Sequence, residues 1–288
     1  MELVTVGLPV YNAERFLKDC VSSILAQTFK DFKLLIVNDG STDRSMEIVS
    51  EFKDPRIEII DDGENRGLPY RLNQIAKLAT TKYLARMDAD DIMHYRRLEI
   101  QFALMESQDT IDVLGTNTYT LDTDNNIEGL RLAPKEDGEY NLIPTQNFAH
   151  PTIIAKTSWF QDNPYDEKAV RCEDAELWLR TKGRYSFCLY DRPLLFYREY
   201  YRNNATKYFK SLKGLWYISI KLIRTNRIRE GLKYIFKGPM KYFLLGCMFT
   251  CYGFLGKEDS IIAKRSKKLS KEMLKNAMLD LSISLGNS

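Results

Sequence analysis

Residues 88–91 form an acidic cluster that limits how this chain can fold. Asp88, Asp90 and Asp91 closely follow the short apolar run 83–85, which is typical of a buried strand. Three like charges this close together repel, so a folded chain tolerates them at a strand end only where a cation or a donor-rich ligand neutralises them. We expect a divalent metal there, shared with a phosphate. The alternative is an acidic loop that only faces solvent.

The residues after Asp88 narrow the choice of metal. A calcium EF-hand loop requires glycine at its sixth position, whereas this cluster has Met93 there, preceded by the apolar Ile92. Magnesium and similar ions are usually held by one or two carboxylates together with substrate phosphates. The cluster therefore predicts a Mg²⁺ or Mn²⁺ site.

The first part of the chain alternates between short apolar runs and helical patterns. The apolar runs are residues 4–8, 32–37, 57–60 and 83–87. This alternation predicts an α/β fold with a mostly parallel central sheet flanked by helices, whose ligands lie beyond the carboxyl ends of the strands. Pro9, Asp39, Arg66 and Asp88 fall at or just beyond such ends, so we expect them to meet in one crevice.

Several further elements are predicted from local signals. Asn12 is expected to cap the first helix, and Ser41 or Thr42 the second. The later elements are a helix at 96–107, a helix with an acidic first turn at 172–180, β runs at 185–190 and 194–197, and helices from residue 206 onward. We expect Gly238 and Pro239 to break the helical tail, because proline disrupts a helix interior.

Composition excludes several classes of protein. With 288 residues, 44% of them hydrophobic, the chain can bury a real core and is not disordered as a whole. Its five cysteines show no paired CxxC spacing, so they indicate neither a disulfide framework nor a zinc site. The N-terminus lacks the basic start and cleavage site of a signal peptide. We expect a reducing, cytoplasmic compartment.

Charge separates a body from a tail. Residues 1–200 carry 24 Lys and Arg against 34 Asp and Glu, whereas the last 88 residues carry 18 against 5. We therefore expect a catalytic domain over 1–205 and a basic amphipathic helical extension over 206–288. Aromatic side chains beside its cations favour an anionic membrane surface. Helices packed on the catalytic domain are the alternative, and nucleic acid is a lesser one.

Five motifs in order carry a family resemblance. They are residues 8–12, 37–43, 65–67, 88–91 and 173–180. Together they resemble the family 2 inverting glycosyltransferases of GT-A fold, and the resemblance covers residues 2–200. It implies a nucleotide-sugar donor and a divalent metal.

The resemblance assigns roles to particular residues. Those implied to bind the nucleotide sugar are Pro9, Tyr11, Asn12, Asp39, Arg66, Asp88 and Arg198. Asp39 would contact the base and Asp90 the metal, with Asp88 on either the ribose or the metal. Asp174 matches the catalytic base, and the adjacent Glu173 is the alternative.

Three further residues have less defined roles. Asp91 is expected not to bind the metal directly but to contact the residues that do. His150 is either a metal-side or acceptor-side group, or a hydrogen-bonded structural residue, which is the commoner role of such a histidine. Arg198 lies where the family often has a basic residue that reaches the diphosphate, but Glu199 and Tyr200 follow it where a histidine is usual.

These observations predict a metal-dependent inverting glycosyltransferase. The expected donor is a UDP-sugar, and the expected acceptor is a hydroxyl of a glycan or lipid-linked intermediate in surface polysaccharide synthesis. The enzyme would be peripheral on the inner face of the plasma membrane and would not bind nucleic acid. A sugar-1-phosphate nucleotidyltransferase would need a Gly-rich basic loop after the first strand, which residues 8–12 do not provide. A non-catalytic binding protein of the same fold is the other alternative.

Overall fold

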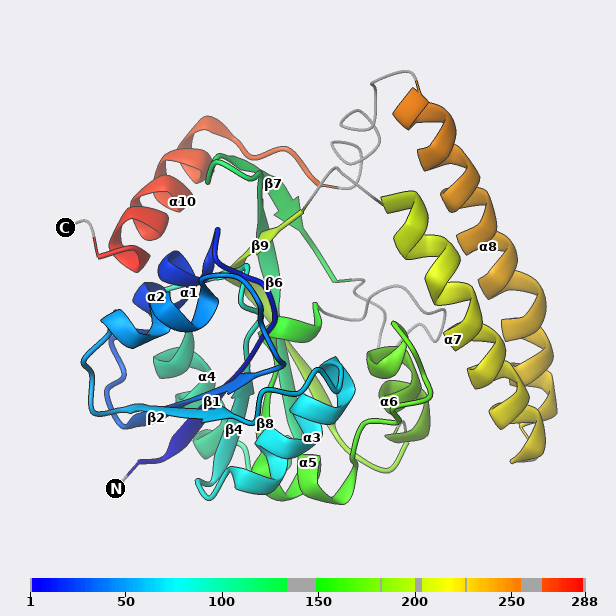
Figure 1. Ribbon diagram of the computed structural model, residues 1–288, viewed down its shortest axis with the longest axis horizontal. Helices are drawn as coiled ribbons and strands as arrows, with labels where there is room; N and C mark the ends of the chain where they lie inside the picture. Colours follow the sequence, from blue (N-terminus) through cyan, green and yellow to red (C-terminus); the bar gives the residue numbers. More distant parts are fainter. Residues whose placement is uncertain are drawn as a thin grey trace.

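The computed structural model describes residues 2–133, 149–181, 183–199, 204–225, 227–254 and 266–286. Nine strands form one mixed sheet in the order β3-β2-β1-β4-β8-β6-β9-β5, with β7 paired to β6 (Figure 1). The strands are β1 (Val4–Val10), β2 (Phe32–Asn38), β3 (Ile57–Asp61), β4 (Tyr83–Arg86), β5 (Ile92–Met93), β6 (Val113–Leu121), β7 (Ile127–Arg131), β8 (Ile154–Lys156) and β9 (Phe187–Arg198).

Helices cover both faces of this sheet. They are α1 (Leu17–Leu25), α2 (Ser45–Glu51), α3 (Leu68–Leu78), α4 (Arg97–Ser107), the 3₁₀ turn η1 (His150–Thr152), α5 (Thr157–Asp162), α6 (Glu173–Thr181), α7 (Asn204–Arg224), α8 (Ile228–Phe254) and α10 (Lys271–Ser284). The predicted α/β class with a mostly parallel central sheet is confirmed.

Strands β1 to β4 are parallel, and their order places β1 between β2 and β4. The chain thus leaves the sheet in opposite directions after β1 and β4, and ligands of such sheets bind in the crevice at that point. Strand β8 runs antiparallel to β4 and β6, whereas β9 is parallel to β6. The acidic cluster follows β4 and therefore lies at this crevice.

Alternating side chains of the parallel strands build two cores. In β2, Leu34 and Ile36 pack into the core with α1 and α4, whereas Leu35 and Val37 pack with α3 and α5. Successive side chains of a strand point to opposite faces, so an uninterrupted apolar run is what a sheet covered on both sides requires. This is the physical basis of the predicted strand 32–37.

Two predicted helix caps are wrong. Asn12 does not cap α1, which begins at Leu17, and neither Ser41 nor Thr42 caps α2, which begins at Ser45. The side chains of Asn12 and Ser41 instead accept amides from each other's loops. Tertiary contacts between two loops outweigh the local capping preference at these positions.

Two further predictions differ from the structure. Gly238 and Pro239 do not break a helix, because α8 continues through Pro239. Close packing along α7 holds α8 on both sides of this proline: a Cβ at Gly231 would lie 2.5 Å from Ile223, and one at Gly246 would lie 2.8 Å from Phe209. The β runs predicted at 185–190 and 194–197 form the single strand β9.

The three tail helices occupy two separate places. Helices α7 and α8 lie side by side as a hairpin against α6, whereas α10 lies on the other side of the sheet (Figure 1). Ala277 and Leu281 of α10 pack with Leu130 and Phe196, and Lys267 pairs with Leu130. Residues 255–265, which fall within the predicted helical tail, lie outside the described residues. Within the described parts of the chain, no helix combines the length and apolar character needed to cross a membrane.

Candidate functional site

The loops after β1 and β2 are tied together into one wall of the crevice. Asn12, with a left-handed φ of 47°, accepts at Oδ1 the main-chain amide of Thr42 (2.8 Å) and donates its own amide to Ser41 Oγ (3.1 Å). Asparagine tolerates this backbone conformation better than most residues. Tyr11 beside it is exposed, and Pro9 is buried within β1.

Asp39 follows β2, and its carboxylate is held from several sides. Oδ1 accepts the main-chain amide of Arg66 (2.7 Å) and Nε of Arg71 (2.9 Å), and the amide of Gly67 lies 3.1 Å from both carboxylate oxygens. Oδ2 therefore retains acceptor capacity for a donor such as a ring N–H of a base. Arg66 reaches Asp39 through its main chain.

Arg71 is a residue beside the candidate site whose contacts the sequence did not reveal. Its side chain is fully buried in α3 and joins Asp39 to Asp62 (2.6 Å) and Gln74 (2.8 Å), and it also donates to the Glu64 carbonyl. Asp39 is 32 residues away in the chain, so no local pattern marks this contact. The guanidinium is bidentate to Asp62 and donates through Nε to Asp39, so this buried cation helps to fix the Asp39 carboxylate in position.

The acidic cluster has the composition and geometry of a metal site. One carboxylate oxygen from each of Asp88, Asp90 and Asp91 lies within 4.8 Å of the others. Asp91 is buried, and its Oδ2 has no hydrogen-bond partner among the described atoms. Burial raises the pKa of Asp91, and Asp90 and Asp88 raise it further. A cation would relieve this repulsion, so the residues fit Mg²⁺ or Mn²⁺.

Arg86, at the end of β4, is a second residue whose role the sequence did not reveal. It is buried and pairs with Asp88 through both terminal nitrogens, at 2.7 and 3.0 Å. Its positive charge also acts on Glu173 and Asp174, whose pKa values it lowers. One buried cation therefore faces both the acidic cluster and the carboxylates of α6. The only sequence signal was its position two residues before Asp88.

Arg198 is buried at the end of β9 and holds the loops around the acidic cluster. Its main-chain amide donates to Asp91 Oδ1 and its Nε to the Asp90 carbonyl, both at 2.8 Å. The terminal nitrogens donate to the Asp122 carbonyl and Asn125 Oδ1. These contacts give Arg198 a positioning role, and its predicted contact with the diphosphate stays a prediction.

Glu173 and Asp174 form the first turn of α6 and are half-buried. Burial raises the pKa of Glu173 to about 7, with a further contribution from Asp174. Burial also raises the pKa of Asp174, although the amide of Ala175 opposes this by donating to Oδ1 (2.7 Å). A carboxylate with a raised pKa is suited to accept a proton near neutral pH.

His150, in the 3₁₀ turn before β8, is buried. Its Nε2 lies 2.8 Å from the Tyr165 hydroxyl, and its ring meets Trp178 edge-on. Burial lowers the pKa of His150, and Arg86 lowers it further. The hydrogen bond to Tyr165 supports the structural role.

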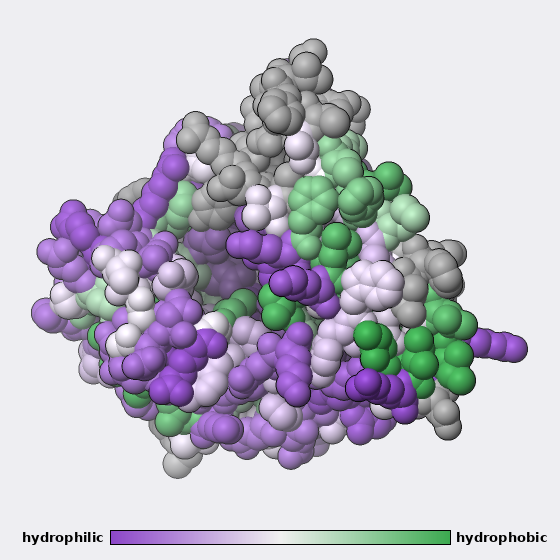
Figure 2. Space-filling model, turned by 45° about the vertical axis from the view of Figure 1, so that its right-hand side comes forward, coloured by the Kyte–Doolittle hydropathy of each residue, from purple (hydrophilic) through white to green (hydrophobic). Residues whose placement is uncertain are grey.

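Lys207 comes from the first turns of α7, outside the predicted catalytic domain. It is half-buried, and burial lowers its pKa, as does Arg171, whereas Asp90 and Glu199 oppose this. A lysine of the tail thus adds positive charge near the acidic cluster. On this side the molecular surface is hollowed, and hydrophilic side chains line the hollow (Figure 2).

Sequence and structure comparisons agree with this geometry. Residues 5–166 match the family described as "Glycosyl transferase family 2". An uncharacterized glycosyltransferase of Methanocaldococcus jannaschii is 34% identical over 229 residues, covering 76% of this chain and 78% of its own length. The UDP-Glc:alpha-D-GlcNAc-diphosphoundecaprenol beta-1,3-glucosyltransferase WfgD of Escherichia coli is 30% identical over 177 residues, or 62% of this chain and 68% of the relative.

Two solved structures share the fold. Staphylococcus aureus TarS 1-349 in complex with UDP has a TM-score of 0.59 at 20% identity, covering 77% of this chain and 66% of TarS 1-349. The mannosyltransferase PcManGT of Pyrobaculum calidifontis, in complex with GDP-Man and Mn²⁺, has a TM-score of 0.62 at 14% identity, covering 99% and 85%. With its family match over residues 5–166 and this fold, the chain belongs to glycosyl transferase family 2 and has the GT-A fold of a glycosyltransferase.

Proposed function

We propose that this glycosyltransferase is metal-dependent and inverting, and transfers a sugar from a UDP-sugar to a hydroxyl of a glycan or lipid-linked acceptor. The observation that carries the proposal is the arrangement of three carboxylate groups around one crevice, two at strand ends and one in the first turn of α6. They are Asp39 after β2, the acidic cluster after β4, and the pair Glu173 and Asp174 on α6.

Each group has a separate task in this proposal. Asp39 binds the base through Oδ2, within the wall formed by the loops after β1 and β2. Asp174, or Glu173 beside it, accepts the proton of the acceptor hydroxyl. The acceptor oxygen then bonds to the anomeric carbon as the bond to the diphosphate breaks, and one in-line displacement inverts that carbon.

Asp88 and Asp90 would hold the metal, with Asp91 behind them. A bound Mg²⁺ or Mn²⁺ would neutralise the charge that develops on the leaving diphosphate. The chain itself contributes the placement of these carboxylates: Arg86 orients Asp88, and Arg198 fixes Asp91 and the Asp90 main chain.

The names of relatives support the donor and acceptor classes in this proposal. WfgD is named for UDP-Glc and a diphosphoundecaprenol-linked acceptor, and TarS has been solved with UDP-GlcNAc. We infer a UDP-sugar donor and a lipid-linked glycan acceptor in surface polysaccharide synthesis. Such an acceptor places the enzyme at the inner surface of the plasma membrane, as a peripheral protein.

Nucleotide release tests the proposal. Purified protein is incubated with UDP-Glc, UDP-GlcNAc or GDP-Man and a lipid-linked acceptor, with Mn²⁺, with Mg²⁺ or with chelator, and free nucleoside diphosphate is measured. We expect acceptor-dependent UDP release that chelation removes, and a product of inverted anomeric configuration by NMR. Release of pyrophosphate would indicate a nucleotidyltransferase, and donor binding without transfer to any acceptor would indicate a binding protein. Either result would refute the proposal.

A further inference from the structure

The α7–α8 hairpin carries a large share of the exposed apolar side chains of this chain. Among the described residues they are Phe209, Trp216 and Ile220 on α7, and Ile228, Leu232, Met240, Phe243 and Leu244 on α8, and they are exposed by 38 to 59%. Figure 2 shows hydrophobic side chains gathered over the hairpin, beside the hydrophilic hollow. We call these eight residues the hairpin face.

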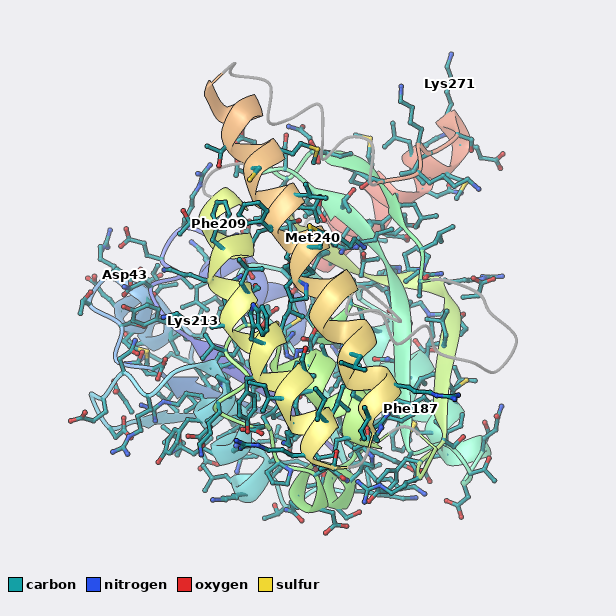
Figure 3. All side chains as sticks on the ribbon, turned by 90° about the vertical axis from the view of Figure 1, so that its right-hand side faces the viewer. Asp43, Phe187, Phe209, Lys213, Met240 and Lys271 are labelled. Carbon is teal, nitrogen blue, oxygen red and sulfur yellow. The ribbon has the colours of Figure 1, made fainter. Side chains whose placement is uncertain are left out.

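The hairpin face is continuous across the two helices. The exposed residues of α7 recur at spacings of seven and four, and thus lie on one side of the helix. The opposite side of α7 is buried and contains Leu215, Ile218 and Leu222. The rings of Phe209 and Phe243 lie 6.1 Å apart across the two helices. In Figure 3 the hairpin faces the viewer, with Phe209 on α7 and Met240 on α8, and no described element covers it.

Cations surround this apolar face. Residues 204–254 contain ten Lys and Arg and one acidic residue, Glu230. The exposed cations among the described side chains are Lys210, Lys213, Arg224, Arg229 and Lys241. An apolar stripe with exposed aromatic rings and flanking lysines is complementary to an anionic lipid surface, because the rings enter the headgroup zone while the cations meet the phosphates.

Helix α10 provides a contrast within the same basic tail. Its aligned residues Ala277, Leu281 and Ser284 are buried against the catalytic body. Its exposed apolar residues are Met273, Met278 and Leu279, and their spacings of five and one form no stripe along one side of the helix. Of the hairpin and α10, the hairpin is therefore the part of the tail with an amphipathic face that no described element covers.

We propose that the hairpin face is the site at which the enzyme rests on an anionic phospholipid surface, without crossing it, and that α10 is not part of this site. This proposal rests on the proposed function, because the lipid-linked acceptor is part of that function. It divides the basic tail into a membrane-binding hairpin and a helix that belongs to the body.

The buried side of the hairpin links the membrane to the reaction. Lys221 of α7 pairs with Glu176 of α6 (2.8 Å) and with Asp166 (2.6 Å). Gly214 packs directly on the Val170 carbonyl and on Cys172, which immediately precedes Glu173. The helix that rests on the membrane is thus packed against the helix that carries the predicted base. Binding at the hairpin face would bring a lipid-linked acceptor to α6.

Vesicle sedimentation of the purified full chain, without donor, tests the proposal. We expect binding to vesicles rich in phosphatidylglycerol and weak binding to phosphatidylcholine vesicles. The double variant Trp216→Ser/Phe243→Ser should bind the anionic vesicles about tenfold more weakly. The matched control on α10, Met278→Ser/Leu279→Ser, should bind within about twofold of the wild-type chain. Circular dichroism and UDP binding show that each variant is folded.

Three results would overturn the proposal. They are no binding of the wild-type chain to anionic vesicles, an equal loss in the α10 control, and a dimer in sedimentation velocity that Trp216→Ser/Phe243→Ser dissociates. The last result would assign the face to a second copy of the chain. Transfer to a soluble acceptor is measured in parallel, so intact vesicle binding without any transfer would refute the proposed function and leave the membrane site standing.

Discussion

Replacing Arg71 by methionine would test whether a buried ion pair holds the base-binding carboxylate. Methionine keeps the length and apolar stem of the side chain but removes every donor. Asp39 would then keep only the main-chain amides of Arg66 and Gly67. The side chains of Arg71 and Asp39 are 0% and 7% exposed, so the lost interaction is a buried one.

The structure sets the size of the effect. Removing one partner of a buried pair costs about 3–5 kcal/mol, because the other charge is left unpaired. The two amides that remain on Asp39 place Arg71→Met near the lower end, at about 3 kcal/mol. For a chain of this size each kcal/mol shifts the midpoint of thermal unfolding by roughly 2–4 °C, so we expect a decrease of about 6–12 °C.

Arg66→Met is the matched control. The Arg66 side chain is 45% exposed, and its Nε lies 3.5 Å from Asp62, so its ion pair contributes less than about 1 kcal/mol. Thermal unfolding and UDP binding by calorimetry are measured for both variants. For Arg71→Met we also expect UDP affinity to fall about tenfold, since an unanchored carboxylate is no longer preorganised.

A double-mutant cycle with Asp39→Asn separates the pair from general damage. If the pair carries the effect, the double variant is less destabilised than the sum of the single variants. A decrease in the unfolding midpoint equal to that of Arg66→Met, together with unchanged UDP affinity, would refute this reasoning.

The remaining predictions concern the acidic groups and one lysine. Asp90→Ala and Asp174→Asn should each abolish transfer in the nucleotide-release assay with little change in unfolding midpoint; full activity in Asp174→Asn would remove it as the base. The folded chain holds a proton on Glu173 up to a pKa of about 7, above the ordinary value of 4.5, so its contribution to stability falls as pH rises from about 4.5 to 7. In urea unfolding at pH 8, the free energy of unfolding of Glu173→Gln should therefore exceed that of the wild type by about 1–3 kcal/mol. At pH 4.5 the two should be almost equal. Lys207→Ala should raise the KM for the donor about tenfold, whereas Lys210→Ala on the exposed side of α7 should not; equal effects would exclude a local role for Lys207.

The elements that sequence predicted well are those determined by local patterns. The run 32–37 became β2 because its alternate side chains enter two cores, and the helix at 96–107 became α4. The predicted sheet also has Asp39 and Asp88 just after strands, as the family motifs implied. In each case the relevant information lies within a few consecutive residues.

The features that sequence reasoning missed depend on contacts between distant residues. Asn12 looks like a helix cap, yet its side chain binds a loop 30 residues later. The sequence pattern predicts Arg71 as an exposed polar position of an amphipathic helix. It is buried because Asp39 and Asp62, which lie elsewhere in the chain, pair with it. Pro239 is a helix breaker by local rules, but packing against α7 keeps α8 continuous.

Sheet topology explains why residues so far apart reach one crevice. Strands β1, β2, β4, β6 and β9 all point the same way, so their carboxyl ends share one edge. Strand β8 runs the opposite way, which brings its amino end, and with it His150, to that same edge. The edge therefore collects Asp39, Asp88 and Arg198 from the ends of parallel strands, and α6 adds Asp174. Because β8 runs opposite to its neighbours, a residue that precedes β8 lies at the same edge as residues that follow the parallel strands. For this reason the position of His150 at this edge of the sheet follows from the direction of β8 and not from any motif around the histidine.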